Sequence, residues 1–285
     1  MKLSIILVNW NTKEITRDAL ASIYRETDGF PFEVIVVDNN SQDSSVEMIK
    51  KEFPLVRLIE NDDNKGFGKA NNQGLKIATG EYLMFLNTDV IVLDKAINKL
   101  VDYLDQHPDV MMGGPRLLNK DLTFQHACRR MLPNPTNSFF HLFGFAKIFK
   151  KNKFINDYKQ YNSNPDITGQ TQALSGAAML FRRQVYEEIG GFDEVFFMYG
   201  EDLDFCKRVL DKGWKTMYIS NAKIIHFGGQ SSDKRRVKSL INFYQAMWVY
   251  YKKYFYSKHN FIFNGIVWLG IKLKMVAALV FNNLK

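Results

Sequence analysis

Residues 3–8 read Leu-Ser-Ile-Ile-Leu-Val, a run of five apolar residues and one serine that stops at Asn9-Trp10-Asn11. An unbroken apolar run of this length is typical of a strand that is buried on both faces of a parallel sheet. The run is too short for a secretory signal, and no small-residue cleavage site follows it, so a cytoplasmic protein is expected. The sequence therefore predicts a central strand of an α/β sheet at residues 3–8.

The first half of the chain repeats this strand signal with helical patterns in between. Apolar runs and helical periodicities alternate, with strands at residues 33–37, 56–59 and 82–86 and helices at residues 15–23, 46–53, 70–78 and 93–104. The second half is less regular, with strands at residues 174–181, 214–219 and 222–226, helices at residues 184–189 and 202–210, and no clear periodicity over residues 116–170. Alternating strands and helices predict a mostly parallel sheet flanked by helices.

Polar residues follow several of the predicted strands. Asn9, Asp38, Asn64 and Asp89 each lie just past a strand. Ligands of such sheets bind beyond the carboxyl ends of the strands, so these four residues are expected at one edge. Taken alone, each is a weak signal, because an ordinary turn residue or helix cap explains it at least as well.

Two of these segments have features that suit a diphosphate. Gly66-Phe67-Gly68 precedes a helix, where glycines let backbone N–H groups approach a phosphate, although a plain capping loop has the same pattern. The spacing matches neither a dinucleotide fingerprint nor a P-loop. Asp89 can hold a divalent cation that bridges a diphosphate. His226 is either a structural histidine or a second metal ligand, and as a ligand it would favour Mn²⁺ over Mg²⁺.

Three acids fall within four residues at a predicted helix start, namely Glu201, Asp202 and Asp204. Acids at this position complement the helix dipole, which is a sufficient structural reason for them. The apolar residues 196–199 before them can also raise the pKa of a carboxyl enough for it to act as a base. Small residues around Gly176 leave room either for a sugar or for close helix packing.

The order of these motifs resembles that of the inverting family 2 glycosyltransferases with the GT-A fold, and within them the rhamnosyltransferase-like group. The resemblance covers roughly residues 1–230 and rests on six ordered motifs, at residues 6–11, 36–41, 64–72, 86–89, 176–179, and 190–193 running into 200–202. It implies a Rossmann-like GT-A domain with a mixed, mostly parallel sheet, and an enzyme that uses a nucleotide-diphosphate sugar.

The resemblance also implies roles for single residues. Asp202 matches the catalytic base, with Glu201 as the alternative. Asp89 and His226 match the metal site, for Mg²⁺ or Mn²⁺; because Asn87 replaces the first acid of the family's DXD element, these two residues and the diphosphate must hold the cation. Asp38 would read a pyrimidine base. The residues that would border the donor are Val8, Asn9, Trp10, Asp38, Asn40, Asn64, Gly66, Phe67, Asn71, Asn87, Thr88, Asp89 and Gly176.

The net charge of +8 is concentrated in two segments. Residues 234–285 carry ten Lys/Arg and no acid, and the segment between Asp121 and Asp157 carries six and none. Both segments are rich in aromatic residues, the second at residues 139–151. Residues 261–281 are long enough to span a bilayer, but two central lysines would cost about 2.5–3.5 kcal/mol each. Attachment to an anionic membrane surface is therefore expected, with a membrane-spanning helix and a dimer-forming tail as the alternatives and no nucleic-acid partner.

These expectations combine into a GT-A domain over residues 1–233 and a helical tail over residues 234–285. The nucleotide-binding half is residues 1–115 and the acceptor-binding half is residues 116–233. The expected reaction transfers a sugar to a lipid-linked saccharide in cell-surface polysaccharide synthesis. The donor expected first is dTDP-rhamnose, which would transfer L-rhamnose, and the second choice is a UDP-sugar. A sugar nucleotidyltransferase would carry a basic glycine-rich loop at residues 9–11, and a non-catalytic membrane scaffold would not need the acids.

Overall fold

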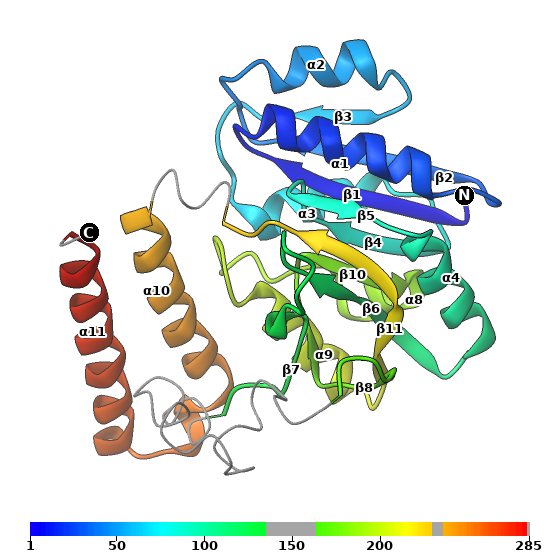
Figure 1. Cartoon of the computed structure of the whole chain (residues 1–285). Coiled ribbons are helices and arrows are strands. Elements are labelled where there is room, and N and C mark those ends of the chain that lie inside the picture. Colours follow the sequence, from blue (N-terminus) through cyan, green and yellow to red (C-terminus); the bar gives the residue numbers. More distant parts are fainter. Residues whose placement is uncertain (135–163, 230–235, 284–285) are drawn as a thin grey trace.

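The computed structural model describes residues 1–134, 164–229 and 236–283 as a sheet domain with a helical hairpin on one side (Figure 1). The strands are β1 Leu3–Asn9, β2 Phe32–Asp38, β3 Arg57–Glu60, β4 Tyr82–Leu86, β5 Val90–Val92, β6 Val110–Leu118, β7 Arg129–Arg130, β8 Gly169–Gln170, β9 Ala173–Leu174, β10 Ala178–Arg182 and β11 Lys215–His226. The helices are α1 Lys13–Glu26, α2 Ser45–Glu52, α3 Phe67–Ile77, α4 Ala96–Gln106, α8 Arg183–Ile189, α9 Glu201–Asp211, α10 Arg236–Tyr254 and α11 Phe261–Asn283.

The main sheet runs in the order β3-β2-β1-β4-β10-β6-β11-β5, with β8 paired to β11. Strands β3, β2, β1 and β4 are parallel, and β6 is parallel to β11. Strand β10 lies antiparallel between the two groups, and β5 is antiparallel to β11. The predicted α/β class with a mostly parallel, mixed sheet is confirmed.

Strand β1 shows why the opening run is almost entirely apolar. Leu3, Ile5 and Leu7 join a core that includes α1 and α4, whereas Ile6 points into a second core that includes α3 and α9. Successive residues of a strand face opposite sides of the sheet, so a strand covered on both faces needs apolar residues on both. The exception, Ser4, is buried with its hydroxyl donating to Glu33. Each fully buried aliphatic side chain stabilises the fold by about 1.5–3 kcal/mol.

The structure differs from the expected elements mainly in the second half. The strand expected at residues 174–181 is divided into β9 and β10 by a turn at residues 175–177, and the two strands expected at residues 214–226 form the single irregular strand β11. Strand β6 was not expected, because Gly113-Gly114-Pro115 reads as a break. A Cβ at Gly113 would lie 2.9 Å from the Leu104 and Ile219 side chains, and one at Gly114 would lie 2.5 Å from Leu174. These glycines permit close packing inside a strand.

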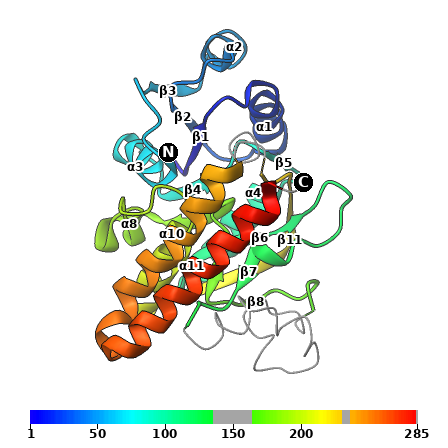
Figure 2. The same ribbon diagram turned by 90° about the vertical axis from the view of Figure 1, so that its left-hand side faces the viewer.

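Helices α10 and α11 form an antiparallel hairpin beside the sheet domain, with α11 outermost (Figures 1 and 2). Helix α10 packs through Ala246 and Tyr250 against Phe196 and the turn before α9. Helix α11 has the length and the apolar composition of a membrane-crossing helix, but most of its surface is exposed. The aromatic segment at residues 139–151 lies outside the described residues.

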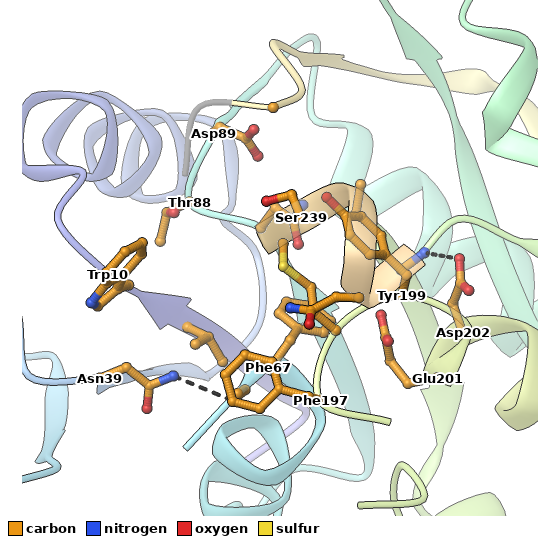
Figure 3. Close-up of a pocket in the computed structure, with 18 of the residues that line it drawn as sticks. Trp10, Asn39, Phe67, Thr88, Asp89, Phe197, Tyr199, Glu201, Asp202 and Ser239 are labelled. Carbon is orange, nitrogen blue, oxygen red and sulfur yellow. Dashed lines mark hydrogen bonds between the residues drawn. The ribbon is translucent and has the colours of Figure 1, made fainter. Parts of the chain in front are cut away.

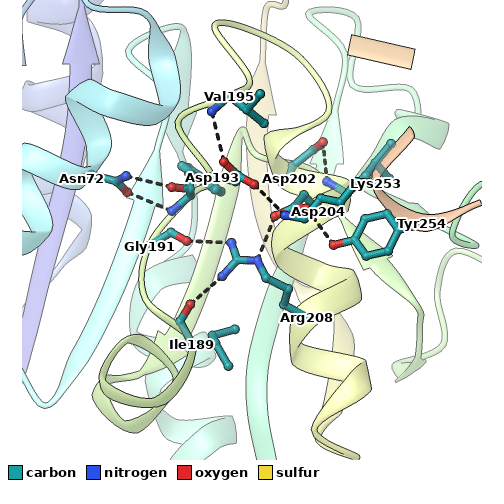
Figure 4. Close-up of polar contacts among 12 residues, drawn as sticks. Asn72, Ile189, Gly191, Asp193, Val195, Asp202, Asp204, Arg208, Lys253 and Tyr254 are labelled. Carbon is teal, nitrogen blue, oxygen red and sulfur yellow. Dashed lines mark hydrogen bonds and ion pairs between the residues drawn. The ribbon is translucent and has the colours of Figure 1, made fainter. Parts of the chain in front are cut away.

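A buried carboxylate fixes α10 to α9 (Figure 4). Asp204 on α9 is fully buried and accepts hydrogen bonds from Arg208 Nε at 2.8 Å and from Tyr254 Oη at 2.7 Å. Lys253 Nζ lies 2.5 Å from Asp204 Oδ1 and 2.6 Å from Asp193 Oδ2. Arg208 also donates to the backbone carbonyls of residues 189 and 191. We call Asp204, Arg208, Lys253 and Tyr254 the Asp204 cluster.

Candidate active site

A pocket of about 400 Å³ lies at the carboxyl edge of the parallel strands (Figure 3). Trp10 and Asn39 stand on one side of it, Glu201 and Asp202 stand on the opposite side, and Asp89 lies above and between them. A pocket of this size with a few convergent polar groups is the usual form of a small-molecule site.

Most of the predicted site residues line this pocket. They are Val8, Trp10, Asn64, Gly66, Phe67, Asn87, Thr88, Asp89, Gly176, Glu201, Asp202 and His226. They come from the ends of β1, β4 and β11, the starts of α3 and α9, and the turn between β9 and β10. The fold therefore brings together residues that are more than 200 positions apart.

Asn9 and Asp38 lie beneath the pocket rather than in its lining. Asn9 Nδ2 donates to Asp38 Oδ1 at 2.6 Å, and the Ser41 backbone N–H donates to Asp38 Oδ2 at 2.8 Å. Asp38 is only 2% exposed. These two side chains link the ends of β1 and β2 and support the loops that carry Trp10 and Asn39 into the pocket.

Asn40 and Asn71 are also outside the lining. Asn40 is exposed, and its Nδ2 donates to the carbonyl of Asp62 at 2.6 Å. Asn71 is buried in α3 and donates to the carbonyl of Phe67 at 3.0 Å, one turn earlier. Asn40 thus joins its loop to the loop at residue 62, whereas Asn71 bonds within the first turns of α3.

The Gly66 loop is closed against the residues that precede α9. Gly66 has φ +87°, and a Cβ there would lie 2.6 Å from the Phe197 carbonyl oxygen, so only glycine fits. The Phe67 N–H donates to that same oxygen at 2.9 Å. The Gly66 loop and the residues that precede α9 are thus joined through the backbone of Phe197.

Asp202 is held by an ion pair that the sequence did not reveal. Arg130 on β7 places Nη2 2.5 Å from Asp202 Oδ2, and both side chains are more than four-fifths buried. The Gly176 N–H also donates to Oδ2 at 3.2 Å. A Cβ at Gly176 would lie 3.3 Å from the Asp202 Cβ, so the small residue lets the carboxylate approach the turn between β9 and β10. Asp202 is therefore fixed in direction before any ligand binds.

Glu201 has a different environment from its neighbour. It is 6% exposed, and its Oε2 makes no hydrogen bond to any described residue. Burial, and next the negative charge of Asp202, raise the pKa of Glu201 to about 8. Glu201 therefore keeps its proton at neutral pH. A catalytic base must be ionised, so the retained proton of Glu201 favours Asp202 as the candidate base.

The turn before these acids is strained. Tyr199 and Gly200 both have positive φ, of 72° and 82°. A non-glycine residue in this region costs of order 1 kcal/mol, and such strain is concentrated at functional sites. Packing of Phe196 and Ala246 around Gly200 holds the turn. Helix α10 thus supports the residues that present Glu201 and Asp202.

The pKa of Glu201 leads to a prediction about stability. A carboxyl whose pKa is about 4.5 when unfolded and about 8 when folded binds its proton more tightly in the folded state, so wild-type stability falls as the pH rises through that window. Glu201→Gln removes this loss. Its free energy of unfolding relative to wild type should rise by a few kcal/mol between pH 5 and pH 8, measured by urea unfolding. A difference that does not change with pH would show that Glu201 ionises normally.

Asp89, Asn87 and His226 form a polar group at the ends of β4 and β11. His226 Nε2 lies 3.3 Å from Asp89 Oδ1 and 3.4 Å from Asn87 Nδ2. Gln125 Nε2 donates to the carbonyl of His226, so its Oε1 is free to accept from His226 Nδ1, at 2.8 Å. In the neutral imidazole, a proton on Nδ1 leaves the lone pair on Nε2, the ring nitrogen that lies beside Asp89. The Asn87 Oδ1 is buried and makes no hydrogen bond to the described residues.

Helix α10, which was expected to belong to a separate tail, forms one wall of the pocket. Lys238, Ser239 and Asn242 line the pocket, and Lys238 Nζ lies 5.7 Å from the centre of the Phe197 ring. The expected boundary at residue 233 therefore cuts through the site. The other lining residues that were not predicted are Asn39, Ser175, Ala177, Phe197, Met198, Tyr199 and Gly229. Several of them adjoin predicted motifs, but α10 gave no local signal.

Comparison with known proteins agrees with this architecture. The model of glycosyl transferase family 2 matches residues 4–190, and that of glycosyl transferase family group 2 matches residues 108–284. An N-acetylglucosaminyl-diphospho-decaprenol L-rhamnosyltransferase of Mycobacterium tuberculosis is 25% identical, over 87% of this chain and 83% of the relative. The O-antigen chain rhamnosyltransferase RfbN of Salmonella typhimurium is 26% identical, over 79% and 66%.

Solved structures share the fold. The mannosyltransferase PcManGT from Pyrobaculum calidifontis, in complex with GDP-Man and Mn²⁺, has a TM-score of 0.56 at 19% identity, and the match covers 86% of this chain and 63% of that chain. TarS 1-349 of S. aureus has the same TM-score and identity, with 85% and 65% covered. This chain spans less than two thirds of either solved chain. Since a family model matches well over half of its residues, the protein belongs to glycosyl transferase family 2 and is a glycosyltransferase with the GT-A fold.

Proposed function

We propose that this glycosyltransferase moves a sugar, with inversion, from a nucleotide diphosphate to a hydroxyl of a lipid-linked saccharide. The observation that carries the proposal is the position of Asp202, fixed across one pocket from Asp89 and His226. The first donor to test is dTDP-rhamnose and the next is a UDP-sugar, because two relatives are named as rhamnosyltransferases and one of them acts on a decaprenol-linked substrate. Synthesis of a cell-surface polysaccharide fits these names.

In this mechanism Asp202 removes the proton from the acceptor hydroxyl. The oxygen forms its bond to the anomeric carbon from the face opposite the leaving group. The bond from that carbon to the diphosphate breaks, and the nucleoside diphosphate departs with the electron pair. Arg130 and the Gly176 N–H hold the carboxylate in direction, and neutral Glu201 adds no second charge beside the growing bond. Positioning the base in advance lowers the entropic part of the barrier.

The donor would lie over the ends of β1, β2 and β4. Trp10 and Asn39 offer an aromatic surface and an amide for the nucleoside, and Asn64, Gly66, Phe67 and Thr88 continue this wall. Asp38 stays the proposed reader of a pyrimidine N–H, because its two hydrogen bonds leave acceptor capacity on the carboxylate. Since Asp38 is 2% exposed and lies beneath the lining, the base would have to enter below Trp10 and Asn39 to meet it.

Asp89, His226 and the Asn87 Oδ1 fit a divalent cation. They supply one carboxylate, one imidazole lone pair and one amide oxygen without a partner among the described residues, and a diphosphate would supply further oxygens. Structures of PcManGT and of GalNAc-T7 contain Mn²⁺. A bound cation would neutralise charge on the leaving diphosphate. Either Mg²⁺ or Mn²⁺ suits these ligands, and the imidazole favours Mn²⁺.

Asp89→Ala should weaken donor binding at least tenfold in the presence of Mn²⁺ and remove most of its metal dependence, because the only carboxylate of the proposed metal site is lost. Titration calorimetry with the donor, with and without Mn²⁺, measures both effects. Asp18→Ala, at an exposed aspartate on α1, is the matched control. Unchanged metal-dependent affinity in Asp89→Ala would remove this residue from the metal site.

A donor-hydrolysis screen tests the function as a whole. dTDP-, UDP- and GDP-sugars are offered with Mg²⁺ or Mn²⁺, and the best donor is then tested with a polyprenyl-diphosphate-linked sugar as acceptor. Hydrolysis or transfer that depends on Asp202 would support the proposal. The failure of every donor to turn over, with and without acceptor, would contradict it.

The same proposal places the protein on the cytoplasmic face of the cell membrane, attached peripherally through residues 234–285, with anionic lipids as partners.

A further inference from the structure

The outer face of α11 is an uninterrupted apolar stripe. Its members recur every three or four residues and are each between 51% and 60% exposed: Ile262, Ile266, Leu269, Leu273, Val276 and Val280. This spacing places all six on one side of a helix. Over 18 residues the stripe extends about 27 Å. An exposed apolar surface of this length indicates an interaction site.

The inner face of α11 is bound to α10. Asn264 and Ile271, two turns apart, are buried against the hairpin. Tyr251 Oη donates to Asn264 Oδ1 at 2.6 Å, and Asn264 Nδ2 donates to the backbone carbonyls of Tyr256 and His259. Helix α10 is in turn held on the sheet domain by the Asp204 cluster and by Ala246 and Tyr250.

This packing is incompatible with a membrane-spanning α11. A spanning helix must be surrounded by lipid or by other spanning helices, because polar groups without partners are costly in the bilayer. Helix α11 lies along α10, whose far side contacts α9 and lines the polar pocket with Lys238 and Asn242. Inserting α11 across a bilayer would take α10 and this wall with it. A bilayer can therefore reach only the outer stripe.

The charges beside the stripe identify its partner. Lys272 and Lys274 are partly exposed, and at 100° per residue they lie roughly 80° and 120° from the centre of the stripe, one on each side. The two helices contain no Asp or Glu. A second copy packed on the stripe would bring lysines together without counter-ions, whereas lipid phosphates would pair with them. Lysines beside an embedded apolar face extend toward the head groups.

We infer that α11 lies flat in the interface of an anionic membrane, with its Ile262–Val280 stripe among the upper acyl chains and Lys272 and Lys274 at the phosphates. This deepens the proposed function by fixing how the enzyme meets its lipid-linked acceptor. Packed helices lie about 8–10 Å apart, so the α10 wall of the pocket lies one helix away from the membrane surface. The sugar of an acceptor can then enter the pocket while its lipid stays in the bilayer.

Vesicle sedimentation of the full chain tests the surface. The double variant Leu269→Glu/Leu273→Glu should bind vesicles of phosphatidylglycerol and phosphatidylethanolamine at least tenfold more weakly than wild type, because two apolar contacts become charges. Leu55→Glu, at an 80% exposed leucine after α2, is the matched control and should bind like wild type. Wild-type binding by the double variant would overturn the inference.

Labelled cysteines separate a flat helix from a spanning one. Environment-sensitive dyes at Ile262→Cys, Leu269→Cys and Val280→Cys should be quenched equally by lipids brominated at one depth. A deepest position near Leu269 would indicate a span and overturn the inference. The two native thiols do not interfere: both are buried, and burial raises the pKa of Cys128 to about 11 and that of Cys206 to about 12.

Two further measurements separate this inference from its alternatives. Sedimentation velocity should show the same oligomeric state in wild type and in Leu269→Glu/Leu273→Glu; loss of a dimer would assign the stripe to a second copy and overturn the membrane assignment. Donor hydrolysis in solution should be equal in the two proteins, while transfer to the lipid-linked acceptor falls in the variant. Vesicle binding needs no turnover, so it tests the surface even where the proposed function fails.

Discussion

Asp202→Asn is expected to lower kcat for sugar transfer by roughly 10²–10⁴, the usual contribution of one positioned base. Asparagine keeps the shape and a carbonyl oxygen that can accept from Arg130 and from the Gly176 N–H, but it cannot take up the proton of the acceptor hydroxyl. In the proposed arrangement the donor lies on the opposite wall, so donor affinity should stay within about twofold. Transfer kinetics and calorimetry with the donor measure the two quantities separately.

Glu201→Gln is the matched comparison for this loss. Glu201 is already neutral near pH 7, because burial and the charge of Asp202 raise its pKa to about 8. A neutral amide in its place should therefore keep kcat within about tenfold of wild type. If Glu201→Gln were as inactive as Asp202→Asn, or if Asp202→Asn turned over normally, the base would not be Asp202. Urea unfolding of both variants shows whether either loss reflects the fold.

The sheet was predictable because its central strands are buried on both faces. A strand such as β1, which contributes Leu3, Ile5 and Leu7 to one core and Ile6 to the other, must be mostly apolar on both faces, and this pattern can be read without a structure. Strand β6 was not predictable, since Gly113 and Gly114 are required there only because side chains on α4, β9 and β11 pack closely against them. Local sequence cannot show that a glycine is needed for close packing.

The candidate site divides in the same way. Its strand-end residues, such as Asn87 and Asp89, were predictable because polar residues that directly follow buried strands reach one edge of the sheet. Glu201 and Asp202 were predictable from their place at a helix start and from the family resemblance. The environment of the acids was not. Arg130 is 72 positions from Asp202, and the wall from α10 is about 40 positions further along the chain, so only tertiary packing brings them to the pocket. The lysines of α11 show the same limit. Their insertion cost argued against a span, but only the packing of α11 on α10 shows which face of the helix avoids both of them.

Asp204→Asn is expected to lower the free energy of unfolding by about 3 kcal/mol, the lower end of the range for breaking a buried ion pair. Asp204 is fully buried, whereas Arg208 and Lys253 keep 21% and 31% of their side-chain surface, so part of the loss is recovered by solvent. The variant leaves two cations facing a neutral amide and weakens the contact between α9 and α10. Guanidinium unfolding measures the change, and single-phase curves are needed to compare the variants.

The same helix provides the control. Lys207 and Asp211 are an (i,i+4) pair of opposite charge on α9, as Arg208 and Asp204 are, but more than half of the Asp211 side chain is exposed. Exposed pairs of this kind contribute about 0.3–0.5 kcal/mol, so Asp211→Asn should be nearly neutral. Combining Asp204→Asn with Lys253→Met should lower the free energy of unfolding by less than the sum of the single changes, because both changes remove the same Asp204–Lys253 ion pair. Equal effects of Asp204→Asn and Asp211→Asn would mean that burial adds nothing to this pair and that apolar packing alone holds α10 beside Glu201 and Asp202.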